Sequence, residues 1–220
     1  MPVAFSCPMF PNLVTYHIHH QEPLPSSDAL AYQYILAGNG LFIRTETRFF
    51  SVLMPIAKAT VRGLPSLAFD FQLKIPLLPV SLLSNVLTNA RLVRNADGRL
   101  NEVLYHLHHN GRSVQLIKPP QQTTAVSIAA PENATNTLLC DPHSHGNMAA
   151  FWSSTDNADE QAARLYAVIG HLDSQPEIRL RVGCYGYWHP LPLTAVFAPT
   201  QGPFPFIDRN VHPPKTKPPL

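Results

Sequence analysis

The sequence has little charge and little cysteine. Only 14% of its 220 residues are charged, the formal net charge is +2, and no cluster of lysine and arginine stands out. Such a balance offers no basic surface to a nucleic acid, so no nucleic-acid partner is expected. The three cysteines, Cys7, Cys140 and Cys184, are odd in number and far apart. That spacing argues against a disulfide framework and favours a reducing compartment.

Long apolar runs are also missing. No stretch approaches the ~18 apolar residues that a membrane-spanning helix needs. The first ten residues, MPVAFSCPMF, lack the charged start and the continuous apolar centre of a signal peptide. The sequence therefore predicts a cytoplasmic protein without a membrane partner.

The sequence does contain enough apolar residues, 45%, to fill a core. Residues 1–75 form a β-rich N-terminal region to which the sequence assigns no role. The segment NLVTYHIHH predicts a strand, and the longer segment that starts at Ala31 predicts a hairpin. Asn39-Gly40 would supply the positive φ of its tight turn.

Residues 76–198 predict a second domain of mixed α/β (α+β) class. A helix is expected over residues 81–94, with Ser81 as N-cap and one apolar stripe made of Leu82, Leu83, Val86, Leu87, Ala90 and Val93. Two strands should flank the turn Asn110-Gly111, and TLLC, YAVIGHL and EIRLRVGCYGYW should be further strands. The segment EIRLRVGCYGYW alternates apolar and polar residues, so we expect its apolar side chains to be buried and Glu177, Arg179 and Arg181 to be exposed. Residues 199–220 form a proline-rich tail.

The stretch DPHSHGNMAAFWSSTD, residues 141–156, concentrates groups that bind metal. On an extended segment His143 and His145 point the same way, because alternate side chains share a face. Ser153 and Asp156 are three apart at the start of a predicted helix and share a face of its first turn. Two imidazoles and one carboxylate, with a fourth position open, are the ligand set of a hydrolytic zinc site.

Simpler interpretations exist for each part of this pattern. Ser-x-x-Asp before a helix is also a capping box, which needs no metal. The pairs His17-x-His19 and His106-x-His108 occur in the same histidine-rich chain, and we interpret both as solvated strand faces. The full pattern His-x-His-x7-Ser-x2-Asp is rarer, since the residue frequencies give roughly one chance match in a thousand such chains.

The segment HSHGNMAAFWSSTD resembles the JAMM zinc metalloprotease signature of the JAB/MPN family, whose members remove ubiquitin and ubiquitin-like proteins. The resemblance implies a curved β-sheet flanked by helices, with Zn²⁺ held by His143, His145 and Asp156. It also implies a glutamate at the first strand after the long helix, and Glu102 stands there. The family often has a small residue two or three positions later, where this chain has Leu104 and Tyr105. Glu132 is the competing glutamate.

The resemblance also suggests catalytic roles. Glu102 would carry protons as general base and acid, and Ser153 would donate to the oxyanion of the tetrahedral intermediate. Asp141, Ser154 and Thr155 are near enough in sequence to support the ligands. A cysteine protease built on Cys140 and His143 is the rival chemistry, but a cysteine after TLL is more typical of a small buried residue. His189 is interpreted as closing a strand.

The family resemblance predicts a zinc-dependent isopeptidase or peptidase acting on the C-terminal tail of a ubiquitin-like protein. The wording around the motif is similar to the PRTRC-system JAB proteins, a bacterial plasmid-associated group. Their gene clusters also encode a ubiquitin-like protein and an activating-enzyme-like protein, the two partners expected here. A non-catalytic MPN-type scaffold or binding module and a small-molecule hydrolase with the same zinc site remain alternatives, because a fold does not fix a substrate.

Overall fold

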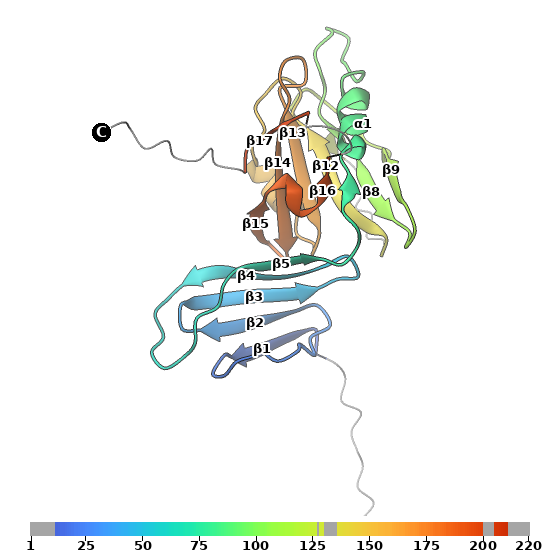
Figure 1. Cartoon of the computed structure of the whole chain (residues 1–220). Helices are drawn as coiled ribbons and strands as arrows, with labels where there is room; N and C mark the ends of the chain where they lie inside the picture. The colour runs from blue at the N-terminus through green and yellow to red at the C-terminus, as the bar shows by residue number, and fades with distance from the viewer. Residues whose placement is uncertain (1–11, 127, 130–135, 200–204, 211–220) are drawn as a thin grey trace, which may run out of the picture. The chain divides into compact units, whose positions relative to one another are not determined.

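The computed structural model describes residues 12–126, 128–129, 136–199 and 205–210. The chain forms two compact units, Met1–Lys74 and Ile75–Leu220 (Figure 1). Strands dominate the described residues, and the α-helices lie in the second unit, so the class is mixed α/β as expected. No helix in the described part of the chain is long and apolar enough to cross a membrane.

The N-terminal unit is a five-stranded sheet in the simple order β1-β2-β3-β4-β5. The first two strands are parallel and the others antiparallel. Its strands are β1 (Val14–Ile18), β2 (Tyr32–Ala37), β3 (Gly40–Glu46), β4 (Phe50–Lys58) and β5 (Asp70–Leu73). The β-rich character expected for this region is therefore present.

The predicted hairpin exists, but its turn lies one residue earlier than expected. Ala37 pairs with Gly40, so the two turn residues are Gly38 and Asn39. Gly40 carries the positive φ of +145°, inside β3, and a Cβ there would lie 2.2 Å from the carbonyl oxygen of Ala57. Glycine is needed at this position by its conformation and by the close approach of β4.

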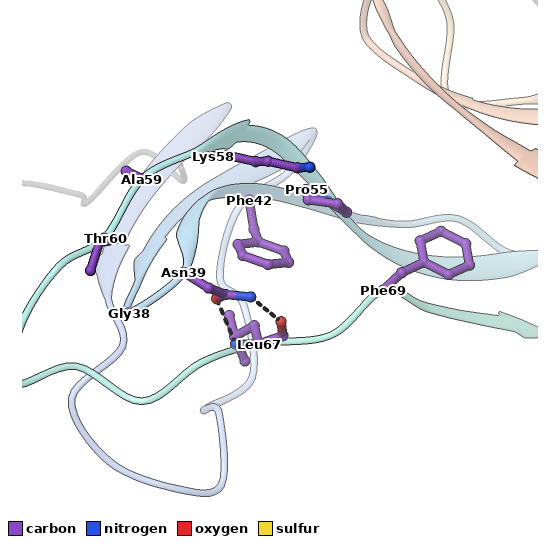
Figure 2. Close-up of a pocket in the computed structure, with 9 residues that line it drawn as sticks. All are labelled: Gly38, Asn39, Phe42, Pro55, Lys58, Ala59, Thr60, Leu67 and Phe69. Atoms are coloured by element: carbon purple, nitrogen blue, oxygen red, sulfur yellow. Dashed lines mark hydrogen bonds between the residues drawn. The ribbon is translucent and has the colours of Figure 1, made fainter.

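One face of this sheet is covered by loops of its own unit. Ile35 and Phe42 are buried there against Leu67 and its neighbours. Asn39 fastens the loop, because its side chain donates to the carbonyl of Leu67 at 2.8 Å and accepts from the Leu67 N–H at 2.9 Å. Beside this contact lies a pocket of about 740 Å³, with Phe42 and Leu67 in its wall (Figure 2).

The second unit is built on a sheet in the order β15-β14-β13-β12-β8-β9 (Figure 1). Strand β7 also pairs with β12, and β17 pairs with β14. The central strands β12 (Leu138–Ser144) and β13 (Leu165–Gly170) are parallel and fully buried. The other members are β7 (Val103–Leu104), β8 (His106–His109), β9 (Val114–Ile117), β14 (Glu177–Cys184), β15 (Tyr187–Leu191) and β17 (Ile207–Asp208). Short pairs are β6 (Leu78–Pro79) with β16 (Phe197–Ala198), and β10 (Gln122–Thr123) with β11 (Ile128–Ala129). A 3-10 turn, η1, spans Leu193–Ala195.

The long helix α1 (Ser81–Ala90) buries the predicted stripe at Leu83, Val86, Leu87 and Ala90. Two details differ from the sequence prediction. The N-cap is Val80, without a side-chain cap, so Ser81 does not have the predicted capping role. The helix ends four residues early, because Arg94 bridges to Leu100 across the turn that contains Gly98.

The charged face of β14 is not exposed, contrary to the sequence prediction. Glu177 and Arg181 are each only 5% exposed. Arg181 is covered by the segment that follows β12, and Glu177 pairs with Arg209. Arg209 belongs to the predicted proline-rich tail, whose residues 205–210 instead include β17, paired in parallel with β14, and the buried Phe206. The apolar pair Phe206-Ile207 explains why this part of the tail packs on the domain.

Candidate metal centre

The first two candidate ligands come from the end of β12. Leu138–Ser144 is buried at every position, and β12 lies between β13 on one side and β7 and β8 on the other. His143 and His145 project to the same side, and their Nε2 atoms are 3.1 Å apart. The spacing of two along extended backbone therefore brings the imidazoles together, as the sequence predicted.

The third candidate ligand comes from α2 (Ser154–Asp159). Ser153 is its N-cap, and the complete capping box is formed. The Ser153 hydroxyl accepts from the Asp156 N–H at 3.1 Å, and Asp156 Oδ2 accepts from the Ser153 N–H at 2.6 Å. The simpler interpretation of Ser-x-x-Asp is thus correct, and it also fixes the direction of the Asp156 carboxylate.

The three side chains meet. His143 Nε2 is 3.4 Å from Asp156 Oδ1, and His145 Nε2 is 3.7 Å from Asp156 Oδ2. One ligand atom from each residue lies within 4.8 Å of the other two. Ligand atoms about 2.1 Å from a tetrahedral zinc ion are about 3.4 Å from one another, so the set fits zinc with one position left open.

The surroundings of these three side chains favour the protonation states that metal binding requires. Burial lowers the pKa of His143 to about 4 and also lowers the pKa of His145, so both imidazoles are neutral at pH 7. Burial works to raise the pKa of Asp156, but the neighbouring His143 and the hydrogen bonds with Ser153 bring it below its usual value. Neutral imidazoles beside an ionised carboxylate can ligate a cation without first losing protons.

Glu102 lies beside this group. It directly precedes β7, whose Val103 and Leu104 pair with Ser144 and His143, so the same register continued places Glu102 at the level of His145. Glu102 is 8% exposed, and burial, followed by the nearby charge of Asp156, raises its pKa to about 7. A carboxyl group near half-protonation at neutral pH is suited to proton transfer. Glu132, the competing glutamate, lies outside the described residues.

The outer edge of the segment that carries Glu102 is occupied. The Gln121 side chain donates to the carbonyl of Leu104 at 2.8 Å and accepts from the Leu104 N–H at 2.9 Å. The Glu102 N–H donates to the carbonyl of Thr124 at 2.8 Å. Leu104 and Tyr105 stand where the JAB/MPN family often has a small residue. Both fit this structure, since Leu104 pairs opposite His143 and Tyr105 is buried.

The other histidine pairs are not the solvated strand faces that the sequence suggested. His19 and His106 are both buried. His106 Nε2 lies 3.7 Å from Asp141 Oδ1, and Asp141 is held by Arg164 at 2.5 Å. These residues form a separate polar cluster. Within the described residues, one group of three or more His, Cys, Asp or Glu side chains is close enough to share a metal ion, and it consists of His143, His145 and Asp156.

The remaining candidate residues have structural positions. Cys140 is fully buried in β12, and burial raises the pKa of its thiol well above the usual value, which excludes a ready thiolate nucleophile. His189 lies in β15, with its Nδ1 2.9 Å from the carbonyl oxygen of Pro190. Ser154 and Thr155 occupy the first turn of α2. Cys7 lies outside the described residues.

Sequence reasoning missed two charged residues at this site, Glu160 and Arg181. Glu160 Oε1 lies 3.9 Å from His143 Nδ1, on the side of the ring away from Asp156. Arg181 pairs with Glu160 at 2.5 Å. No local sequence pattern marked these two residues, because strand alternation alone assigned Arg181 to solvent.

Comparison with known families supports the resemblance carried by the motif. Residues 88–183 match the family described as prokaryotic homologs of the JAB domain. The match spans α1 in part, Glu102 and all three candidate ligands. A comparison with curated proteins finds no match for this chain.

Proposed function

We propose that this protein is a zinc-dependent isopeptidase or peptidase of JAMM type that acts on the C-terminal tail of a ubiquitin-like protein. One observation carries the proposal. Two neutral imidazoles and a carboxylate from separate elements meet within 4.8 Å, beside the buried Glu102. A JAB-like match over the same residues supports the reaction class.

Each residue has a distinct task in this proposal. His143, His145 and Asp156 would hold the metal. A bound zinc ion would acidify a water molecule to a pKa of about 7 and polarise the scissile carbonyl. Glu102 takes a proton from the attacking water at its carboxylate and passes it to the leaving amine, since it lies beside the ligands without belonging to the set.

Ser153 would donate its hydroxyl proton to the oxyanion while its Oγ also caps α2. A pair of variants separates the two tasks. Ser153→Ala loses the cap, worth about 1 kcal/mol, whereas Ser153→Gly keeps most of it, since glycine costs only a few tenths at an N-cap. Loss of one oxyanion donor typically lowers kcat by about 10²- to 10³-fold.

We expect both Ser153 variants to lose turnover by that amount, although only Ser153→Ala unfolds at a clearly lower temperature. Single-turnover rates and thermal unfolding of the two variants test this expectation. Near wild-type turnover in Ser153→Gly would leave capping as the sole role of the hydroxyl.

The substrate class follows from the family resemblance and from the shape expected of the groove. An extended tail can gain affinity from its main chain alone, and a narrow groove over a metal favours small residues such as the glycines that end ubiquitin-like tails. Because β7 is paired directly with β12, the tail would lie along the outer edge of the Glu102 segment and not between the two strands. The Gln121 side-chain amide occupies the main-chain N–H and carbonyl of Leu104, so a tail that paired with Leu104 would have to displace that amide. An activating-enzyme-like protein of the same system is the second proposed partner.

Contacts with the folded body of the substrate should add to those of the tail. The N-terminal unit offers apolar side chains for that purpose, because Leu13, Tyr16, Ile18 and Leu30 are all more than half exposed. Exposed apolar side chains can contribute to a protein interaction site. We assign this unit a share of the substrate contact.

The test compares a fusion or lysine-linked conjugate of a ubiquitin-like protein with the isolated tail peptide, each with and without chelator. We expect chelator-sensitive cleavage after the C-terminal glycines, faster on the conjugate. Equal rates on the two substrates would refute body recognition. Absence of chelator-sensitive cleavage would favour a non-catalytic scaffold, and turnover of small amides alone would favour a small-molecule hydrolase.

A further inference from the structure

The metal ligands come from two elements that are held together by few apolar contacts. His143 and His145 are fixed by the buried strand β12, but Asp156 lies on α2, a helix of six residues with no buried side chain. Apolar packing normally fixes a short helix on its domain. Something else must therefore hold the carboxylate at 3.4 Å from His143.

Arg181 makes the contacts that packing does not supply. It projects from β14, is 5% exposed, and donates from Nη1 to Asn157 Oδ1 at 2.7 Å. Its Nε donates to Glu160 Oε2 at 2.7 Å. Asn157 and Glu160 are the residues next to and four after Asp156, so the planar fork of the guanidinium holds the part of the helix that follows Asp156.

The same guanidinium also contacts the segment that enters the helix. Its central carbon lies 3.8 Å from the centre of the Trp152 ring and 4.8 Å from that of Trp188. Trp152 directly precedes the N-cap Ser153, and the Trp188 indole N–H donates to the carbonyl of Glu160 at 2.9 Å. Contacts before and after Asp156 thus converge on one side chain.

Glu160 extends this arrangement to the strand. Its Oε2 pairs with Arg181, and its Oε1 lies 3.9 Å from His143 Nδ1, the ring nitrogen that faces away from the ligand group. At 3.9 Å this contact is longer than a hydrogen bond, so Glu160 borders the outer side of the His143 ring without fixing its tautomer. The line from Arg181 through Glu160 to His143 therefore joins α2 to β12.

We infer that Arg181 is a positioning residue for the metal centre. Through Asn157, Glu160 and Trp152 it holds Asp156 at ligating distance from the two imidazoles, and through Glu160 it borders the outer side of the His143 ring. This inference rests on the metal site of the proposed function, but it adds a requirement that the ligand set alone does not contain. A variant without the Arg181 contacts should bind metal weakly even though all three ligand residues remain.

The test removes the clamp without leaving an unpaired buried charge. The double variant Glu160→Gln/Arg181→Met loses both members of the ion pair, whereas a single truncation would strand the other charge. Arg181→Lys keeps the charge but loses the fork. Arg179→Met is the matched control, because Arg179 lies two residues away on the same face of β14 and donates to the carbonyl of Ala150, not to α2.

Three measurements are made on the full chain. They are zinc affinity by chelator competition, the visible absorption of the Co²⁺-substituted protein, and hydrogen exchange at residues 153–160 without metal. We expect the double variant to bind zinc about 10- to 100-fold more weakly, which is the usual effect of removing a partner of a metal ligand. Its cobalt bands should change and its α2 amides should exchange faster. Arg181→Lys should fall between the double variant and wild type, and Arg179→Met should bind zinc within about threefold of wild type.

The outcomes separate the two claims. A folded double variant with the zinc affinity and cobalt bands of wild type overturns the positioning role and leaves the proposed function intact. If the double variant does not fold, wild-type affinity in Arg181→Lys overturns the role in the same way. Wild-type protein that binds neither Zn²⁺ nor Co²⁺ overturns the proposed function together with this inference. Equal loss of affinity in Arg179→Met assigns the effect to general loosening of the sheet.

Discussion

His145→Ala protein purified without chelator should contain almost no zinc, whereas the wild type should contain about one zinc ion per chain. In the proposed site His145 would supply one of three protein ligands, and its Nε2 lies 3.1 Å from that of His143. Two remaining ligands cannot hold the ion against buffer and chelator. Metal analysis of the purified proteins measures the difference directly.

Thermal unfolding provides an independent readout of the same change. A ligand at 1,000 times its dissociation constant stabilises the native state by about 4 kcal/mol. Added zinc should therefore raise the unfolding temperature of the wild type and leave that of His145→Ala unchanged. His106→Ala is the control, because His106 is also buried in this sheet but lies outside the ligand group. It should lose stability and keep its zinc. Full zinc in His145→Ala, or none in the wild type, would end the enzyme hypothesis in its present form.

The geometry of the candidate metal centre was predictable because its parts depend on local rules. Alternation along β12 places His143 and His145 on one side, and the capping box orients Asp156 relative to its own helix. The hairpin around Asn110-Gly111 followed from turn chemistry in the same way, with Gly111 at a φ of +97°. The meeting of α2 with β12, however, came from the family resemblance and not from any local pattern.

The surroundings of the centre were less predictable, because alternation says which side chains share a face but not which face meets solvent. The apolar face of β14 was assigned to the core, and its charged face to water. In the structure both faces are covered, and Arg181 is buried by ion pairing and by contact with Trp152. His106 was misassigned for the same reason, since it is buried beside Asp141 of β12, which pairs with Arg164. Long-range polar pairing leaves no periodic signal in the sequence.

Glu102→Gln should separate proton transfer from metal binding, with the largest loss of turnover among variants that keep the metal. The substitution preserves size and one hydrogen-bonding oxygen, but the amide cannot accept a proton at neutral pH. General acid–base catalysis by a positioned side chain contributes typically about 10²- to 10⁴-fold, and kcat/KM should fall by that amount. Zinc content should stay at about one per chain, because Glu102 is absent from the group that could hold the ion.

Two further variants complete the comparison. Asp156→Asn removes a ligand, so it should lose zinc and turnover together, which Glu102→Gln should not do. Glu177→Gln is the control for loss of a buried carboxylate, because Glu177 is 5% exposed and pairs with Arg209 away from the ligands. Its turnover per folded molecule should match the wild type. The measurements are zinc content, kcat/KM on the ubiquitin-like conjugate and thermal unfolding. Wild-type turnover in Glu102→Gln would transfer the proton-carrying role to another residue, with Glu132 the first to substitute. Zinc loss in that variant would instead make Glu102 a ligand.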